Sequence, residues 1–272
     1  MGNGSEGRQT IAIAGLGAVG RVVAERLKDM PAYSLAAVSV RDQERAKCFL
    51  VDHAPDAVVV PLDELSDHAD IVIECVPAAR FLEVASPVVA AGKVLIPLSV
   101  GALLDSWSLV DEAEQSGARI LVPTGALVGL DAVQGIAQGI VKSVRMITRK
   151  PVRGLEGAPF VLENGIDLES LDQPVLIFEG TAREAIKGFP ANLNVAVALS
   201  LAGVGPDRTT MQVWADPDLA YNTHRITVDS DSAKLDLTIS NIPSENPATG
   251  RLTALSVVAL LRKMSSSLRI GT

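Results

Sequence analysis

The sequence has few of the residues on which disulfide-stabilised domains and metal centres depend. Its 272 residues include two cysteines, Cys48 and Cys75, and three histidines, His53, His68 and His224. Two cysteines provide neither a disulfide framework nor a metal-ligand spacing, and three scattered histidines do not suggest a zinc site. We therefore predict no metal, and unpaired thiols favour a cytoplasmic location.

Aromatic residues and positive charge are also scarce. Aromatics make up 3% of the chain, and 32 acidic residues against 24 basic ones give a formal net charge of −8. Proteins bind single-stranded nucleic acid by stacking bases on aromatic side chains, and they bind polyanions through basic patches. We therefore expect no nucleic-acid partner.

Long apolar runs are absent as well. Glycine, proline or a charged residue interrupts every run well before the ~20 residues that a spanning helix needs. Residues 1–10 are polar and glycine-rich, unlike the charged start and apolar stretch of a secretory signal. We expect neither a membrane partner nor a signal peptide.

What the chain does contain is a large apolar fraction. Hydrophobic residues make up 48% and charged residues 21%, so the chain can bury a sizeable core. A length of 272 residues fits two domains of roughly 100–200 residues each.

In the first half, short apolar runs alternate with helical patterns. We predict strands at residues 11–14, 35–40, 57–60, 70–75, 93–97 and 119–122. Helical spacing of apolar residues occurs at 18–29, 43–51, 79–91 and 104–115. This alternation predicts an α/β domain over residues 1–125, with a doubly wound parallel sheet covered on both faces.

The pattern changes in residues 126–250, where we predict a second, α+β domain. Helices are expected at 126–138 and 190–201, and strands at 143–150, 174–179, 209–214, 225–229 and 234–240. The last two strands alternate in polarity around Ser-Asp-Ser, which predicts a hairpin in a mostly antiparallel sheet. A last helix is expected at 252–263, and we expect residues 251–272 to pack back on the first domain.

A glycine loop follows the first predicted strand and opens the first helix. It consists of Gly15, Leu16, Gly17, Ala18, Val19 and Gly20. In this context the first glycine permits a tight turn, the second lets the backbone approach a pyrophosphate, and the third lets helix and strand pack closely. The loop predicts a Rossmann domain that binds NAD or NADP at the helix N-terminus.

Two later segments belong to the same predicted cofactor site. Arg41 follows the second strand, where an NAD-selective site usually has an acid, so it is a candidate for binding a 2′-phosphate. Asp42 is a candidate either for the ribose or for capping the next helix. Cys75, Val76 and Pro77 end the fourth strand, and we predict that they border the cofactor.

The second half carries more distinctive motifs. These are Pro123-Thr124-Gly125-Ala126, Leu130-Asp131-Ala132, the run from Lys187 to Val195, Trp214-Ala215-Asp216-Pro217 and Asn222-Thr223-His224. Together with the glycine loop, they resemble the L-aspartate dehydrogenase family over almost the whole chain. The resemblance implies NAD(P)-dependent oxidative deamination of L-aspartate to iminoaspartate, which water converts to oxaloacetate and ammonia. The reverse amination and a supply of imine for NAD biosynthesis are also implied.

The resemblance also assigns roles to residues of the second half. It implies that His224 is catalytic and that Ala126 contacts the cofactor, together with Asn192 or Asn194. Both asparagines lie in the first turns of the helix expected to begin at Pro190, where proline is favoured.

The residues themselves agree with a dehydrogenase. Histidine suits the proton step because its pKa of ~6.5 lies near working pH. The substrate carboxylates need cations or amide N–H groups. We prefer Lys187 and Arg225 as these cations, ahead of Lys150 and Arg153.

Two other functions fit the same fold. One is a related Rossmann dehydrogenase or imine reductase that acts on another small amino acid. The other is a sensor that binds NAD(P) without turnover. For each of them, as for the dehydrogenase, we expect a homodimer formed through an exposed face of the second domain's sheet.

Overall fold

The computed structural model describes residues 8–190, 193–243 and 250–272. The chain divides into two compact units. The first unit comprises Met1–Pro123 and Val257–Leu268, and the second comprises Thr124–Ser256 and Arg269–Thr272. The chain thus leaves the first unit once and returns to it near its end.

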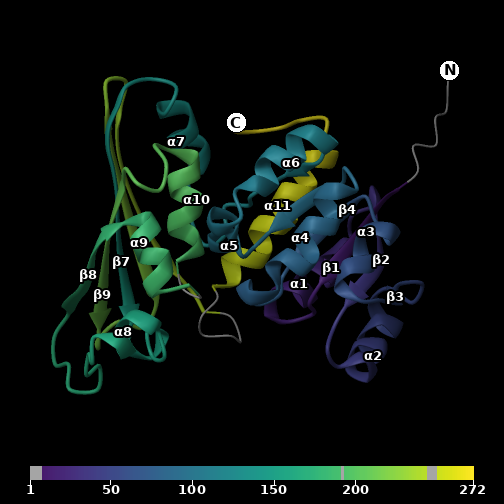
Figure 1. Ribbon diagram of the computed structural model, residues 1–272, viewed down its shortest axis with the longest axis horizontal. Helices are drawn as coiled ribbons and strands as arrows, with labels where there is room; N and C mark the ends of the chain where they lie inside the picture. The colour runs from purple at the N-terminus through teal and green to yellow at the C-terminus, as the bar shows by residue number, and fades with distance from the viewer. Residues whose placement is uncertain (1–7, 191–192, 244–249) are drawn as a thin grey trace. The chain divides into compact units, whose positions relative to one another are not determined.

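The first unit is built on a six-stranded parallel sheet with the order β3-β2-β1-β4-β5-β6 (Figure 1). The strands are β1 Gln9–Ala14, β2 Tyr33–Ser39, β3 Val58–Val59, β4 Ile71–Glu74, β5 Val94–Pro97 and β6 Arg119–Ile120. The order reverses at β1, with β2 on one side and β4 on the other. This arrangement confirms the predicted doubly wound fold, in which ligands bind where the strand order reverses.

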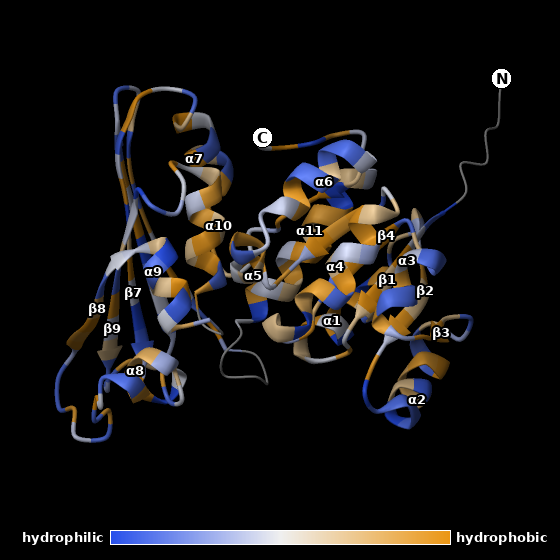
Figure 2. Cartoon of the chain, viewed as in Figure 1, coloured by the Kyte–Doolittle hydropathy of each residue, from blue (hydrophilic) through white to orange (hydrophobic). Residues whose placement is uncertain are grey.

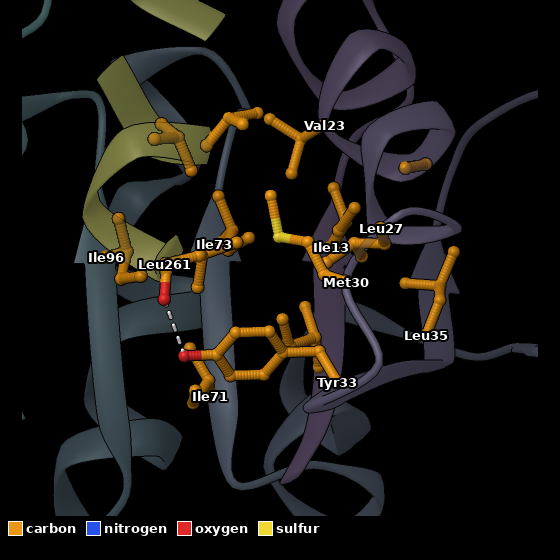
Figure 3. Packing of buried hydrophobic residues seen from close by; sticks show 14 of the residues in the cluster. Ile13, Val23, Leu27, Met30, Tyr33, Leu35, Ile71, Ile73, Ile96 and Leu261 are labelled. Carbon is orange, nitrogen blue, oxygen red and sulfur yellow. Dashed lines mark hydrogen bonds between the residues drawn. The ribbon is translucent and has the colours of Figure 1, made fainter. Parts of the chain in front are cut away.

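Helices cover both faces of this sheet because each strand is apolar on both sides. On one face, Ile13, Ile73 and Ile96 pack with α1 (Ala18–Leu27), α2 (Gln43–His53) and part of α11 (Arg251–Ser265). Figure 3 shows this packing and the hydrogen bond that the Tyr33 hydroxyl donates to the Leu261 carbonyl at 2.8 Å. The last helix is therefore part of the first unit's core.

The other face is covered by helices from the middle of the first unit. Ala14, Val72 and Leu95 pack there with residues of α3 (Leu65–His68), α4 (Phe81–Ala90), α5 (Val100–Asp105) and α6 (Ser108–Ser116). The short 3₁₀ turns η1 (Leu62–Glu64) and η2 (Ala78–Arg80) precede α3 and α4. Figure 2 shows the hydrophobic colouring of β1 and β4 between these layers.

One predicted helix of this unit is wrong. Residues 104–115 form parts of two helices, α5 and α6, with a break at Ser106 and Trp107. Leu103 and Leu109 belong to the same apolar cluster. An unbroken helix would place residues six apart on different faces, so the break allows both leucines to reach one core.

The second unit contains a five-stranded sheet with the order β11-β10-β7-β9-β8. The strands are β7 Val141–Pro151, β8 Val175–Thr181, β9 Thr209–Asp216, β10 Asn222–Ser230 and β11 Lys234–Asn241. The β7–β9 pair is parallel and the other pairs are antiparallel, which confirms the mostly antiparallel sheet and the β10–β11 hairpin. Figure 1 shows α7 (Leu130–Ile136), α9 (Ala182–Gly188) and α10 (Asn194–Ala202) along one face, the inner face.

The helices of this unit depart from the prediction in three respects. The helix expected at 126–138 is the shorter α7, because Gly125 and Gly129 have φ values of +64° and +74° that interrupt a helix. The helix expected from Pro190 begins at Asn194, so Pro190 lies outside it. The short helices α8 (Pro159–Glu163) and α9 were not predicted, although the capping box of Thr181 and Glu184 is a sequence signal for α9.

Candidate active site

The glycine loop of the first unit has a distinct requirement at each glycine. Gly15 has φ +95°, and a Cβ there would lie 2.9 Å from the Cys75 carbonyl oxygen. A Cβ on Gly20 would lie 2.0 Å from the Gly15 carbonyl oxygen, so α1 packs onto the loop only without a side chain. A Cβ on Gly17 would meet nothing within 4 Å. Gly17 therefore borders open space, as a ligand-facing position requires.

The start of α1 fits a pyrophosphate. Its N-cap is Gly17, which offers no side-chain cap, and the first turn has no acidic residue. The first N–H groups of a helix without a cap are available to an anion, and the helix dipole favours negative charge there. Arg21 donates from Nε to the Leu16 carbonyl at 3.0 Å, which holds the loop against the helix.

The strand ends bring the predicted cofactor segments together. The Gly15 amide donates to the Ser39 carbonyl at 2.8 Å, and the Cys75 amide donates to the Ala14 carbonyl at 2.9 Å. Val76 is half-buried and Pro77 is exposed. The loop and the Cys75 segment therefore meet at the carboxyl ends of β1 and β4, where this class of sheet binds its ligands.

Arg41 and Asp42 follow the end of β2. Arg41 is exposed, as a residue that receives a 2′-phosphate must be. The Asp42 carboxylate accepts a hydrogen bond from the Arg45 amide at 3.0 Å and caps α2. Capping, one of the two roles considered for Asp42, is thus confirmed.

Glu74 is a residue that sequence reasoning missed. It is fully buried at the end of β4, and its carboxylate accepts hydrogen bonds from the amides of Val76, Leu98 and Ser99 and from the Ser99 hydroxyl, at 2.9–3.1 Å. Burial raises the pKa of Glu74, although the hydrogen bonds that the carboxylate accepts act to lower it. Glu74 thus links the end of β4 to the residues that follow β5, next to the Cys75 segment. The available signal was a lone acid at the end of the apolar run Ile-Val-Ile.

In the second unit, His224 lies on the inner face of the sheet. It is 3% exposed, and its Nδ1 lies 2.9 Å from the Thr148 hydroxyl on the neighbouring strand β7. When Nδ1 carries the proton and donates to that hydroxyl, Nε2 is left as the basic nitrogen. Burial first, and the charge of Lys150 second, lower the His224 pKa to about 3, so the imidazole is neutral at physiological pH.

Lys150 shares this face. It lies two residues after Thr148 on β7 and is 2% exposed. Burial lowers its pKa to about 8, so the ammonium form still predominates at neutral pH. Sequence reasoning placed Lys150 behind other cations, although the period-two pattern Val144, Met146, Thr148 assigns it to the inner face.

The two preferred substrate cations are exposed, unlike His224. Arg225 is the next residue on β10 and points to the opposite face, where it makes a bidentate ion pair with Asp236 at 2.6 and 3.0 Å. Lys187 is exposed in the last turn of α9. Arg225 therefore already has a carboxylate partner, and its assignment to the substrate loses support.

The segments implied to contact the cofactor in the second unit lie near each other. The Ala126 carbonyl accepts a hydrogen bond from Asn241 Nδ2 at 2.9 Å, which fixes the loop before α7. A Cβ on Gly125 would lie 4.0 Å from the Val195 side chain, so this loop reaches the start of α10, where Asn194 is the first residue. Asn192 lies outside the described residues.

The described part of the chain shows neither a cluster of metal ligands nor a helix that could span a membrane. Within it, no three His, Cys, Asp or Glu side chains gather in the manner of metal ligands. None of the helices in those same ranges combines the length and apolar character that a membrane crossing requires.

Two features define the class of this protein. The glycine loop lies where the strand order reverses, and the second unit carries a buried neutral histidine. Together they define a dehydrogenase that uses a nicotinamide dinucleotide. Comparisons with known proteins agree. Residues 15–123 match the family model "Homoserine dehydrogenase, NAD binding domain", and residues 131–264 match "Aspartate dehydrogenase, C-terminal".

Individual relatives identify the family. An L-aspartate dehydrogenase of Bradyrhizobium diazoefficiens is 54% identical over 96% of this chain and 94% of its own length. L-aspartate dehydrogenase 3 of Bordetella bronchiseptica is 54% identical over 96% and 97%. The crystal structure of aspartate dehydrogenase from Thermotoga maritima, 26% identical, aligns with a TM-score of 0.71 over 97% of this chain and 100% of that one. The chain belongs to the L-aspartate dehydrogenase family, which confirms the predicted family, enzyme class and NAD-type cofactor.

Proposed function

We propose that this protein catalyses the reversible NAD(P)-dependent oxidative deamination of L-aspartate to iminoaspartate, which water converts to oxaloacetate and ammonia. The observation that carries the proposal is the buried His224, held by Thr148, in a chain of this family. A bound nicotinamide would supply the acceptor for the hydride that leaves the α-carbon of the substrate. The glycine loop and the uncapped start of α1 hold the pyrophosphate of that cofactor.

His224 supplies the proton chemistry of the reaction. Its low pKa keeps the imidazole neutral, so Nε2 can accept a proton. That proton comes either from the substrate ammonium or from the water that hydrolyses the imine. In both cases the Thr148 hydroxyl holds the ring orientation, because it contacts Nδ1.

The first experiment measures NAD(P)H formation with L-aspartate for the wild type and for His224→Ala, with His68→Ala, an exposed histidine of the first unit, as the matched control. We expect His224→Ala to lose at least about 100-fold in kcat, the range for a general base, while its NADH affinity stays unchanged. His68→Ala should match the wild type. Equal rates for His224→Ala and the wild type would remove His224 from the chemistry.

The same assay separates the alternative functions. Turnover of another small amino acid, with none of L-aspartate, would indicate a related dehydrogenase or an imine reductase. A thermal shift with NADH and no turnover in either direction, oxaloacetate with ammonia included, would indicate a sensor. Parallel assays with NAD and NADP test the use of both cofactors, which the exposed Arg41 favours. Absence of turnover with NADP would contradict that part of the proposal.

The homodimer and the cellular setting are also proposals. The outer face of the second unit's sheet, opposite the helices, carries the apolar side chains of Ile147, Leu176 and Trp214, none of them fully buried. This face suits a second copy of the chain, and a monomeric mass by light scattering at micromolar concentration would contradict it. The free thiols of Cys48 and Cys75 favour the cytoplasm, where the imine product can supply NAD biosynthesis.

A further inference from the structure

The inner face of the second unit's sheet carries a buried cation that the proton chemistry does not use. Lys150 is 2% exposed, and no carboxylate or other hydrogen-bond partner of its ammonium is found among the described residues. A buried charge is costly unless it is paired. A lysine kept in this position therefore indicates a partner of opposite charge that is not part of the fold.

The inner face is apolar in its middle and polar at one end. Met146 and Ile226 pair across β7 and β10 on this side and are both buried. Beyond them, polar side chains gather at the end of β7 and the start of β10. Thr148 pairs with His224, and Lys150 follows two residues later on β7.

Asn222 adds a second observation at the same end. It lies two residues before His224 on β10, so alternation places it on the inner face. Its side-chain oxygen is buried and has no hydrogen-bond partner in the structure. The polar end of the face thus holds an unpaired ammonium, an imidazole and an unsatisfied amide oxygen, an arrangement that suits a ligand with a carboxylate and an amino group.

The outer face shows the opposite situation. There, Arg149 Nε lies 3.8 Å from the Asp216 carboxylate, and Arg225 is paired with Asp236. Neighbouring cations on the same strands thus have acidic partners on the outer face. Since successive residues of a strand point to opposite faces, these carboxylates are directed away from Lys150.

We propose that the Lys150 ammonium binds a carboxylate of the substrate beside His224. The inference rests on the proposed function, because an amino acid with two carboxylates brings the negative charge that the fold omits. The two residues then have separate tasks. Lys150 holds and orients the substrate by charge, and His224 exchanges the proton. The Lys150 charge also contributes, after burial, to the lowered pKa of His224.

The test compares the full-length wild type with Lys150→Met, which keeps the shape and removes the charge, and with Lys150→Arg, which keeps the charge. Lys142→Met is the matched control, because Lys142 is an exposed lysine on the same strand. We expect Lys150→Met to raise the KM for L-aspartate by about 100-fold, as when one partner of a desolvated ion pair is removed. The change in kcat should be smaller, and NADH affinity should not change.

Two further results are expected. Lys150→Arg should recover part of the loss, and Lys150→Met should raise the melting temperature, since it removes a buried unpaired charge. An unchanged KM in Lys150→Met would overturn the proposal. So would a lowered melting temperature with parallel loss of NADH binding, because that combination indicates a purely structural lysine. If Lys150→Met does not fold, Lys150→Gln, which also removes the charge, is measured in its place with the same expected results.

A binding measurement keeps this proposal separate from the proposed function. Calorimetric titration of the NADH-bound protein with succinate, a dicarboxylate without an amino group, requires no turnover. Should L-aspartate not be a substrate, loss of succinate binding in Lys150→Met, with binding retained in Lys142→Met, still supports a carboxylate site at Lys150. Equal succinate affinity in wild type and Lys150→Met overturns the site whatever the substrate.

Discussion

The two side chains to which we assign the proton chemistry and the carboxylate binding share one sheet face, and burial disfavours the charged form of each. His224 and Lys150 are buried, and burial lowers the pKa of each, to about 3 and about 8. Both shifts mean that the folded protein disfavours the charged form. Lys150 nevertheless remains protonated near pH 7, so the folded state bears the cost of a buried ammonium in the absence of substrate.

The Lys150 pKa leads to a prediction about stability and pH. Between pH 8 and 10.5 the unfolded chain binds a proton at Lys150 that the folded chain has lost. The free energy of unfolding therefore rises with pH across this window. We expect Lys150→Met to be more stable than the wild type at pH 7, and the difference to shrink by up to about 3 kcal/mol by pH 10.5.

Urea unfolding of both proteins at intervals from pH 7 to 10.5 measures this difference. Other groups that titrate in the range, such as Tyr33, are common to both proteins and cancel in the comparison. A difference that stays constant with pH would show that Lys150 has an ordinary pKa in the folded protein.

At the scale of elements, two glycines of the loop between β1 and α1 have different roles, Gly20 in folding and Gly17 in cofactor binding. A Cβ at position 20 would clash with the Gly15 carbonyl, whereas a Cβ at position 17 would project into open space. We expect Gly20→Ala to lower the melting temperature and abolish NADH binding. Gly17→Ala should leave the melting temperature nearly unchanged and weaken NADH binding, because its methyl group occupies the pyrophosphate position.

Thermal unfolding and NADH titration of the two variants provide the measurement, with the wild type as reference. Full NADH affinity in Gly17→Ala would place the pyrophosphate elsewhere. Full stability in Gly20→Ala would mean that α1 does not depend on close contact with the loop.

At the scale of the whole molecule, the chain completes its first unit with its last helix. Val257, Val258 and Leu261 of α11 belong to the core that β1, β2 and β4 form, although more than 130 residues separate them from Pro123. The core of the first unit therefore includes the C-terminal helix, and long-range contacts of this kind slow the formation of a core.

We expect Leu261→Ala to destabilise the protein by about 2–5 kcal/mol, the usual cost of a cavity in a packed core. Leu268→Ala is the control, because Leu268 belongs to the same unit and is 74% exposed. Chemical denaturation of both variants gives the difference. Equal stabilities would show that α11 contributes little to the core of the first unit.

Much of this arrangement could be predicted from local patterns. The strands of both sheets were located because apolar alternation depends only on neighbouring residues, and the glycine loop was recognised because its turn, anion site and close packing need glycine at fixed spacing. Helix boundaries were harder to predict. The break at Ser106 and the late start of α10 at Asn194 depend on which core each segment meets.

The class of fold and the cofactor loop follow from short patterns of residue types in the sequence, whereas the family resemblance is what implies His224 as the base. The difference between the candidate cations depends on the folded structure. Arg225 and Lys150 are both basic residues in strands, and their difference arises from the sheet face that the helices cover. The outer face gives Arg225 the partner Asp236, whereas the inner face buries Lys150 beside His224. Alternation along a strand shows that the two residues differ in face, but which face is buried is set by the packing of helices from distant parts of the chain.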